Sequence, residues 1–382
     1  MFSTSKIKNE ISRANGHLFK SLFSNKNYNF NFRKIKKFRK FKTVVLIGMG
    51  GSILGPKAIY SFLKHKIKKE FIFIDNLDHN FLKEINNKIK ISRSLFVIIS
   101  KSGNTTETIV NSSFFKTYFK KSNVIIISEN KNNILANFAK KKNFEFIKHN
   151  HYIGGRYSVF SEVGMVPAYL MGLDPFKFKQ NLTKILQDKK KLSNSKKNVA
   201  RIFSKKKNII IFFNYIPELH DFLLWSQQLL AESLGKNRKG FIPVISNAPK
   251  DHHSLLQLYL DGPKDKFFYV FSSYGKKSFK VNCNIFGDKT RYFNKKYYEM
   301  IKISQKEAFL KVLKKNNTPF REIKIKKFDE KSLGELFLLF IFETIIFGKK
   351  MKINPFDQPA VESVKILTKK FLNLRNSTKK NF

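Results

Sequence analysis

The chain has 382 residues, enough for two ordinary domains, and its hydrophobic content of 42% excludes a disordered protein. Its single cysteine, Cys283, excludes an internal disulfide and fits a reducing compartment, so we expect a cytoplasmic protein. The most apolar stretch, Leu336–Phe347, is too short to cross a membrane and contains a glutamate. We therefore expect a buried helix there, no membrane partner and no signal peptide.

The charge is strongly basic, with 75 Lys and Arg against 27 Asp and Glu, a net charge of +48. Such a charge raises nucleic acid as a partner. The excess is mostly lysine spread from end to end, whereas nucleic-acid binders more often concentrate basic and aromatic residues on one element. Residues 33–42 (RKIKKFRKFK) are the one segment that could form a basic arm for nucleic acid. Apart from this segment, we expect no nucleic-acid partner.

Predicted strands and helices alternate after a basic segment, residues 1–42, in which we expect a helix or two. Short β-branched and aromatic runs predict buried strands at 43–47, 70–75, 94–100 and 123–128. Apolar residues at helical spacing predict helices at 52–66, 106–120 and 134–142. This alternation indicates a doubly wound, mostly parallel sheet.

The alternation starts again after a lysine- and serine-rich stretch, 188–198, which predicts a linker. Further strands are predicted at 208–213, 267–271 and 320–325, and further helices at 218–234, 333–347 and 361–374. We therefore expect an α/β protein with two domains of similar design. The expected division is a basic N-terminal segment (1–42), a first domain (43–190), a second domain (199–355) and a C-terminal helical segment (356–382).

A glycine turn, Gly48–Ser52 (GMGGS), follows the first predicted strand and opens a helix. Backbone N–H groups and the positive end of the helix dipole can bind an anion at such a turn. A dinucleotide site is the main alternative, because Asp75 ends the next strand where a ribose-binding acid is expected. However, Ile53 occupies the position of the third glycine. On its own, the turn leaves a sugar-phosphate site, a nucleotide site and a structural turn open.

A hydroxyl-rich segment, residues 100–108 (SKSGNTTET), follows the third predicted strand, again at the start of a helix. Hydroxyls and backbone amides around a helix N-terminus can bind a phosphate. A helix cap uses one or two hydroxyls, fewer than this segment offers. A nucleotide P-loop would require Gly-Lys-Ser/Thr after a spaced glycine, which is absent. The segment predicts a site for one small monophosphate.

Together these two segments resemble the sugar isomerase (SIS) domain, and four others narrow the resemblance to the phosphoglucose isomerase family. The others are GGRYS at 154–158 with its continuation to 174, Gln228 with ESLGK at 232–236, HSLLQL at 253–258, and DQPAVE at 357–362 followed by Lys365. The resemblance implies two SIS-type domains and an aldose–ketose isomerase of glycolysis and gluconeogenesis. It would interconvert glucose 6-phosphate and fructose 6-phosphate through an enediol, without cofactor or metal, as a homodimer with a shared active site.

The resemblance also implies roles for individual residues. Glu232 would move the proton between C2 and C1, Gln228 one helical turn away would hydrogen-bond the same substrate, and Arg156 would stabilise the enediolate. His253 would open the sugar ring from the partner subunit, assisted by Lys365. The substrate, and above all its phosphate, would be held by Gly51, Ser52, Ser100, Lys101, Ser102 and Thr105.

Structural and functional alternatives stay open beside these roles. Glu232 could be a surface carboxylate and Arg156 a salt bridge at a domain junction. His252 is expected to pack or to face solvent. We expect His149 and His151 to affect peripheral structure and oligomer contacts more than chemistry. The other functions left open are an isomerase that also accepts mannose 6-phosphate, a non-catalytic sugar-phosphate sensor and a nucleic-acid-binding protein.

Overall fold

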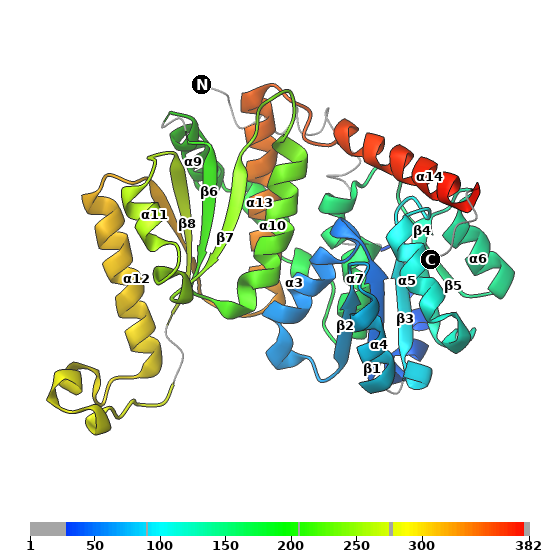
Figure 1. The fold of residues 1–382 in the computed structure, drawn as a ribbon, viewed down its shortest axis with the longest axis horizontal. Helices are drawn as coiled ribbons and strands as arrows, with labels where there is room; N and C mark the ends of the chain where they lie inside the picture. Colours follow the sequence, from blue (N-terminus) through cyan, green and yellow to red (C-terminus); the bar gives the residue numbers. More distant parts are fainter. Residues whose placement is uncertain (1–27, 89–90, 205–206, 275–277, 378–382) are drawn as a thin grey trace.

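The computed structural model describes residues 28–88, 91–204, 207–274 and 278–377, so most of the predicted N-terminal segment lies outside the described residues. Two β-sheets stand side by side, with helices on the faces of each (Figure 1). The strand orders are β2-β1-β3-β4-β5 and β7-β6-β8-β9, and the paired strands are parallel. The predicted fold, two doubly wound α/β sheets, is confirmed.

The first sheet contains the four predicted strands and one more. Its strands are β1 (Thr43–Gly48), β2 (Glu70–Ile74), β3 (Leu95–Ile99), β4 (Val124–Glu129) and β5 (Glu145–His149). Strands β1, β3 and β4 are buried almost throughout, as expected of parallel strands that helices cover on both faces. The edge strand β5 has a short, mixed sequence (EFIKH), which did not predict a strand.

The second sheet likewise has one edge strand that the sequence pattern did not predict. Its strands are β6 (Ile209–Asn214), β7 (Ile242–Asn247), β8 (Lys266–Ser273) and β9 (Phe320–Ile325). The unpredicted strand is β7, which begins Ile-Pro at the edge of the sheet. A proline is tolerated there because an edge strand has unpaired backbone groups on one side.

The six helices predicted after the N-terminal segment are present with shifted ends, as α3, α5, α6, α10, α13 and α14, whereas α4, α7, α8, α11 and α12 were not predicted. The helices before the second sheet are α2 (Phe32–Lys36), α3 (Leu54–Phe62), α4 (His79–Lys88), α5 (Thr106–Phe114), α6 (Ile134–Lys142), α7 (Glu162–Leu170) and α8 (Leu182–Gln187). The later helices are α9 (Lys189–Ser204), α10 (His220–Leu234), α11 (Leu256–Asp261), α12 (Tyr298–Lys315), α13 (Glu330–Met351) and α14 (Glu362–Ser377).

The predicted linker at 188–198 is wrong, because residues 189–198 belong to helix α9. Its lysines conceal a stripe of less polar residues at helical spacing, namely Leu192, Ser195, Val199 and Ile202. Ser195, Val199 and Ile202 are buried, and α9 packs against α13. Burial of this stripe stabilises a helix in a segment whose composition suggested a flexible connection.

One hydrophobic cluster runs between the sheets, from Val44 on β1 to Phe212 on β6, and includes residues of α3, α10 and α13. The apolar stretch Leu336–Phe347 lies within α13 and is largely buried, as predicted. Because the core is shared, the proposed domain bounds stay a prediction. No helix among the described residues is long and apolar enough to cross a membrane.

Candidate active site

The glycine turn and the hydroxyl-rich loop meet at the carboxyl ends of two neighbouring strands. Gly48 at the end of β1 is in register with Ile99 at the end of β3. The chain passes from β1 to β2 on one side of β1, and the next strands, β3 and β4, lie on the other side of β1. The strand order therefore reverses between β1 and β3. Such a switch point is where open α/β sheets bind ligands. Two segments that are about fifty residues apart in the sequence thus lie together at the carboxyl edge of the first sheet.

The hydroxyls of the loop contact one another and the loop backbone. Ser100 Oγ lies 2.8 Å from Thr105 Oγ1, and the Gly103 N–H donates to Ser100 Oγ at 3.2 Å. Thr105 occupies the N-cap position of α5, but its side chain makes no capping hydrogen bond to the helix. The Asn104 N–H donates to Ser102 Oγ at 3.2 Å. Capping therefore does not account for these hydroxyls, and the start of α5 is suited to an anion.

Lys101 adds a positive charge to this loop. Its Nζ lies 3.8 Å from Glu129 Oε1, and Glu129 is also bound by Lys131 at 2.6 Å. Burial lowers the pKa of Lys101; the charges of Lys131 and Arg156 act in the same direction, and that of Glu129 opposes them. Arg156 is thus close enough to act on the loop electrostatically.

Gly50 and Gly51 allow the turn to approach two other segments. A Cβ on Gly51 would lie 2.1 Å from the Gly155 carbonyl carbon, so only glycine fits at this backbone crossing. Gly50 has a φ of +51°, and a Cβ there would lie 2.7 Å from Gln228 Nε2. The turn, which ends at Ser52, is therefore packed against both the GGRYS segment and α10.

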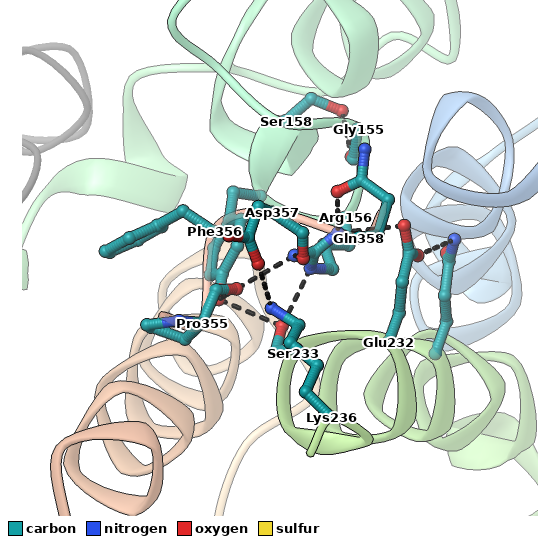
Figure 2. A network of polar contacts seen from close by, with 12 residues as sticks. Gly155, Arg156, Ser158, Glu232, Ser233, Lys236, Pro355, Phe356, Asp357 and Gln358 are labelled. Carbon is teal, nitrogen blue, oxygen red and sulfur yellow. Dashed lines mark hydrogen bonds and ion pairs between the residues drawn. The ribbon is translucent and has the colours of Figure 1, made fainter. Parts of the chain in front are cut away.

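Arg156 is the centre of the polar network in Figure 2. Its Nε donates to Ser233 Oγ at 2.7 Å, and its NH1 donates to Glu232 Oε1 and to Gln358 Oε1, both at 2.8 Å. Its NH2 donates to the carbonyl oxygens of Pro355 at 2.8 Å and Asp357 at 2.9 Å. Every N–H of the guanidinium is therefore bonded, which fixes both the position and the plane of a buried cation.

Helix α10 supplies the carboxylate of this network. Glu232 Oε2 accepts a hydrogen bond from Gln228 Nε2 at 2.8 Å, one turn earlier on the same helix. The Arg156 side chain is 1% exposed, whereas that of Glu232 is 26% exposed. Gln228 Oε1 is buried and has no hydrogen-bond partner among the residues that the structure describes. The site thus combines an accessible carboxylate with a buried cation and a buried amide oxygen.

The loop before α14 closes one side of the network. Asp357 Oδ1 accepts from Lys236 Nζ at 2.6 Å, and this hydrogen bond lowers the pKa of Asp357. Tyr157 OH donates to the Pro355 carbonyl oxygen at 3.0 Å. Sequence reasoning assigned no role to Tyr157, Ser233 or Gln358, although all three stand in the segments that carry the resemblance. The sequence signal for these three residues was their position in those segments.

Two of the predicted catalytic residues are not brought to this network. His253 is exposed in the turn before α11, and no hydrogen bond or ion pair in the described ranges joins it to Arg156 or Glu232. Lys365 lies on α14, is 65% exposed and pairs with Glu362 on the same helix at 2.6 Å. The neighbouring histidine, His252, was not predicted to be catalytic. It packs beside Phe213 and bonds to the Tyr215 hydroxyl at 2.7 Å, as predicted.

Other residues considered from the sequence have structural partners. Asp75 pairs with Lys57 of α3 at 2.8 Å, which accounts for the acid that suggested a dinucleotide site. His149 is buried against Glu162, and Glu162 belongs to the segment that continues GGRYS. The prediction of a peripheral role is therefore wrong for His149. Across the described ranges, no group of three or more His, Cys, Asp or Glu side chains is arranged to hold a metal ion.

Comparison with known sequences gives this geometry a family. A sequence model of phosphoglucose isomerase matches residues 23–240. The glucose-6-phosphate isomerase of Methanocaldococcus jannaschii is 34% identical over 353 residues, which cover 88% of this chain and 86% of that protein. This chain belongs to the phosphoglucose isomerase family. All six segments noted in the sequence fall within a chain that is related to such enzymes over most of its length.

Solved structures share the fold at low sequence identity. A hypothetical protein of Thermus thermophilus superimposes with a TM-score of 0.83 and 23% identity, over 97% of this chain and 96% of that one. A glucose-6-phosphate isomerase of Chlamydia trachomatis gives a TM-score of 0.76 and 20% identity, over 97% of this chain and 74% of that chain. The two-sheet architecture is therefore that of the family.

Proposed function

We infer that this chain is an isomerase that interconverts glucose 6-phosphate and fructose 6-phosphate. The observation that carries the inference is the contact of Arg156, Glu232 and Gln228 beside the glycine turn, in a member of the phosphoglucose isomerase family. The reaction breaks the C2–H bond of the aldose and forms the C1–H bond of the ketose. One hydrogen leaves O2 and one is gained at O1, so the exchange requires no oxidant or reductant.

The phosphate of the substrate binds to the loop at the start of α5. Ser100, Ser102 and Thr105 offer hydroxyls, and Lys101 offers a charge that attracts a dianion. Gly51 and Ser52 belong to the glycine turn at the same edge, where Ser52 adds a further hydroxyl for the substrate. Binding energy at this remote group orients C1 and C2 toward Glu232. The net charge of +48 favours the approach of such an anion.

Glu232 takes the proton from C2 and returns it to C1. A carboxylate can do so when its side chain is accessible to the substrate and held in one orientation, as the hydrogen bond from Gln228 holds it. The enediolate that forms carries negative charge near NH1 of Arg156. The contacts of Nε and NH2 keep the guanidinium in place, so its charge is already oriented when the enediolate develops.

Ring opening would use His253 of the partner subunit, together with Lys365. His253 is exposed and makes no hydrogen bond to the Arg156 network of its own chain within the described residues, which is compatible with a role in a second copy's site. Large apolar side chains are also exposed on the lobe between β8 and α12, which extends from the body of the molecule (Figure 1), and on α14. They include Phe279, Ile285, Phe286, Tyr292, Val364, Ile366 and Phe371. These surfaces support a homodimer, and the lone Cys283 is compatible with a cytoplasmic one.

The test is conversion of fructose 6-phosphate to glucose 6-phosphate by the purified chain, followed with a coupled dehydrogenase. The wild type should turn over, and Glu232→Gln should lose activity by about 10³-fold while still binding fructose 6-phosphate. The amide keeps the size and hydrogen-bonding capacity of the carboxylate but cannot accept the carbon-bound proton. A wild type that binds fructose 6-phosphate without converting it would contradict the proposal.

A further inference from the structure

A buried acid–base pair lies just outside the proposed catalytic residues. His149 ends strand β5 and Glu162 begins helix α7, and His149 Nδ1 is in hydrogen-bond contact with Glu162 Oε1. The two side chains are 1% and 3% exposed. A buried pair of this kind is held only with good geometry and further hydrogen bonds, and its polar atoms are correspondingly fixed.

The second ring nitrogen of His149 reaches the loop that leads to GGRYS. His149 Nε2 lies 3.3 Å from the carbonyl oxygen of Ile153, and a carbonyl oxygen can only accept, so Nε2 carries the hydrogen. The Ile153 N–H donates to the Asn150 carbonyl oxygen at 3.1 Å. Both backbone groups of Ile153 are therefore bonded, directly before Gly154.

Small displacements at this point would be transmitted to the site. Gly155 crosses Gly51 so closely that a Cβ on Gly51 would lie 2.2 Å from the Gly155 carbonyl oxygen. Ser158 Oγ donates to that oxygen at 2.6 Å and lies 3.3 Å from the Gly51 carbonyl oxygen. Arg156 directly follows Gly155 in the chain. The backbone that bears the guanidinium is thus fixed on one side by the glycine turn and on the other by the loop that His149 holds.

We propose that His149 and Glu162 are positioning residues, which fix the Ile153 carbonyl and thereby the approach of Gly155 and Arg156 to the glycine turn. Glu162 orients the imidazole, and the imidazole donates to the loop. The inference rests on the proposed isomerase function, since its consequence for catalysis passes through Arg156. Neither side chain touches the substrate.

Two amide replacements of His149 separate this role from general support of the fold. The amide of His149→Gln can reach the position of Nε2 and keep the bond to Ile153, whereas that of His149→Asn reaches only the position of Nδ1. We expect the Gln variant to retain kcat within about 3-fold and the Asn variant to lose about 10- to 100-fold, with KM nearly unchanged in both. Equal losses in the two variants, or full kcat in His149→Asn, would overturn the proposal.

A second pair at Glu162 provides the same test if a His149 variant does not fold. Glu162→Gln keeps a partner for Nδ1 and should retain kcat within about 3-fold, and Glu162→Leu frees the ring and should lose about 10-fold or more. Melting temperatures are recorded for all four variants. If the loss of kcat parallels the loss of melting temperature in both pairs, the positioning role of His149 and Glu162 is contradicted.

Hydrogen exchange of residues 150–157 gives a readout besides activity. Exchange at Ile153 and Tyr157, whose N–H groups are bonded to Asn150 and Gly154, should be faster in His149→Asn than in His149→Gln. Unchanged exchange in the Asn variant would overturn the proposal even if kcat falls. An inactive wild type would instead contradict the isomerase function, and the exchange comparison would still decide whether His149 holds the loop.

Discussion

The residues proposed for proton transfer and those proposed for ring opening lie in contrasting surroundings. Arg156 is 1% exposed and bonded through every N–H, and Glu232 is held between it and Gln228. His253 is exposed, and Lys365 is 65% exposed with a neighbour on its own helix as its ion-pair partner. One half of the proposed site is thus held together by hydrogen bonds within a single chain, whereas among the described residues no such bond joins His253 or Lys365 to it.

The contrast reflects the chemistry that each half would perform. Stabilisation of an enediolate depends on charges that are already oriented when the transition state forms, so a buried and fully bonded arginine is appropriate. Ring opening requires proton donors that reach a bound sugar, and exposed side chains can supply them from a second copy of the chain. The comparison leads to predictions that treat the two halves differently.

The largest effect is expected at the buried half. Arg156→Lys keeps a positive charge but cannot reproduce five fixed N–H donors, so kcat should fall by about 10²-fold or more, with a smaller change in KM. The measurement is steady-state conversion of fructose 6-phosphate, with the melting temperature recorded in parallel.

Arg321→Lys is the matched control for that change. Arg321 belongs to the second sheet and is in contact with the buried Glu343, and it is not a partner in the Arg156 network. The control should lower the melting temperature and leave kcat within about 2-fold of the wild type. If both variants lose kcat in proportion to stability, the special role of Arg156 is contradicted.

A smaller effect is expected at the phosphate loop. Because the pKa of Lys101 is lowered, its charged form prevails below that pKa and is lost at a lower pH than in an ordinary lysine. The KM for fructose 6-phosphate should therefore rise as the pH is increased through the alkaline range. In Lys101→Gln, KM should be about 5-fold higher near neutral pH and lose this rise, with kcat unchanged.

Lys131→Gln serves as the control for Lys101. Lys131 binds the same Glu129 but is 65% exposed, so its loss should alter KM by less than about 2-fold and preserve the pH dependence. An alkaline rise in KM that persists in Lys101→Gln would show that another group is responsible.

Much of the fold could be predicted from the sequence because its central strands are continuous apolar runs. Strands β1, β3 and β4 carry that signal. The edge strands β5 and β7 do not, since an edge requires less burial and admits polar residues or proline. Helix α9 was missed because lysine and serine dominate its composition, although its buried stripe has helical spacing.

The candidate site was predictable only where a segment carries its own signal. The hydroxyl loop and the glycine turn have local signatures, and Arg156 and Glu232 stand in segments that resemble the family. Their direct contact could not be predicted, because it joins residues 76 positions apart. The roles of Gln358 and His149 likewise depend on tertiary contacts with no local pattern.

The central claim is that one chain supplies Glu232 and Arg156 to each site while the partner subunit supplies the ring-opening histidine. The most direct measurement is the activity of a purified mixed dimer, made by coexpressing differently tagged Glu232→Gln and His253→Ala chains. One of its two sites would then contain both wild-type residues, so activity should return to about half that of the wild type although each parent is nearly inactive. A mixed dimer no more active than its parents would contradict the shared site.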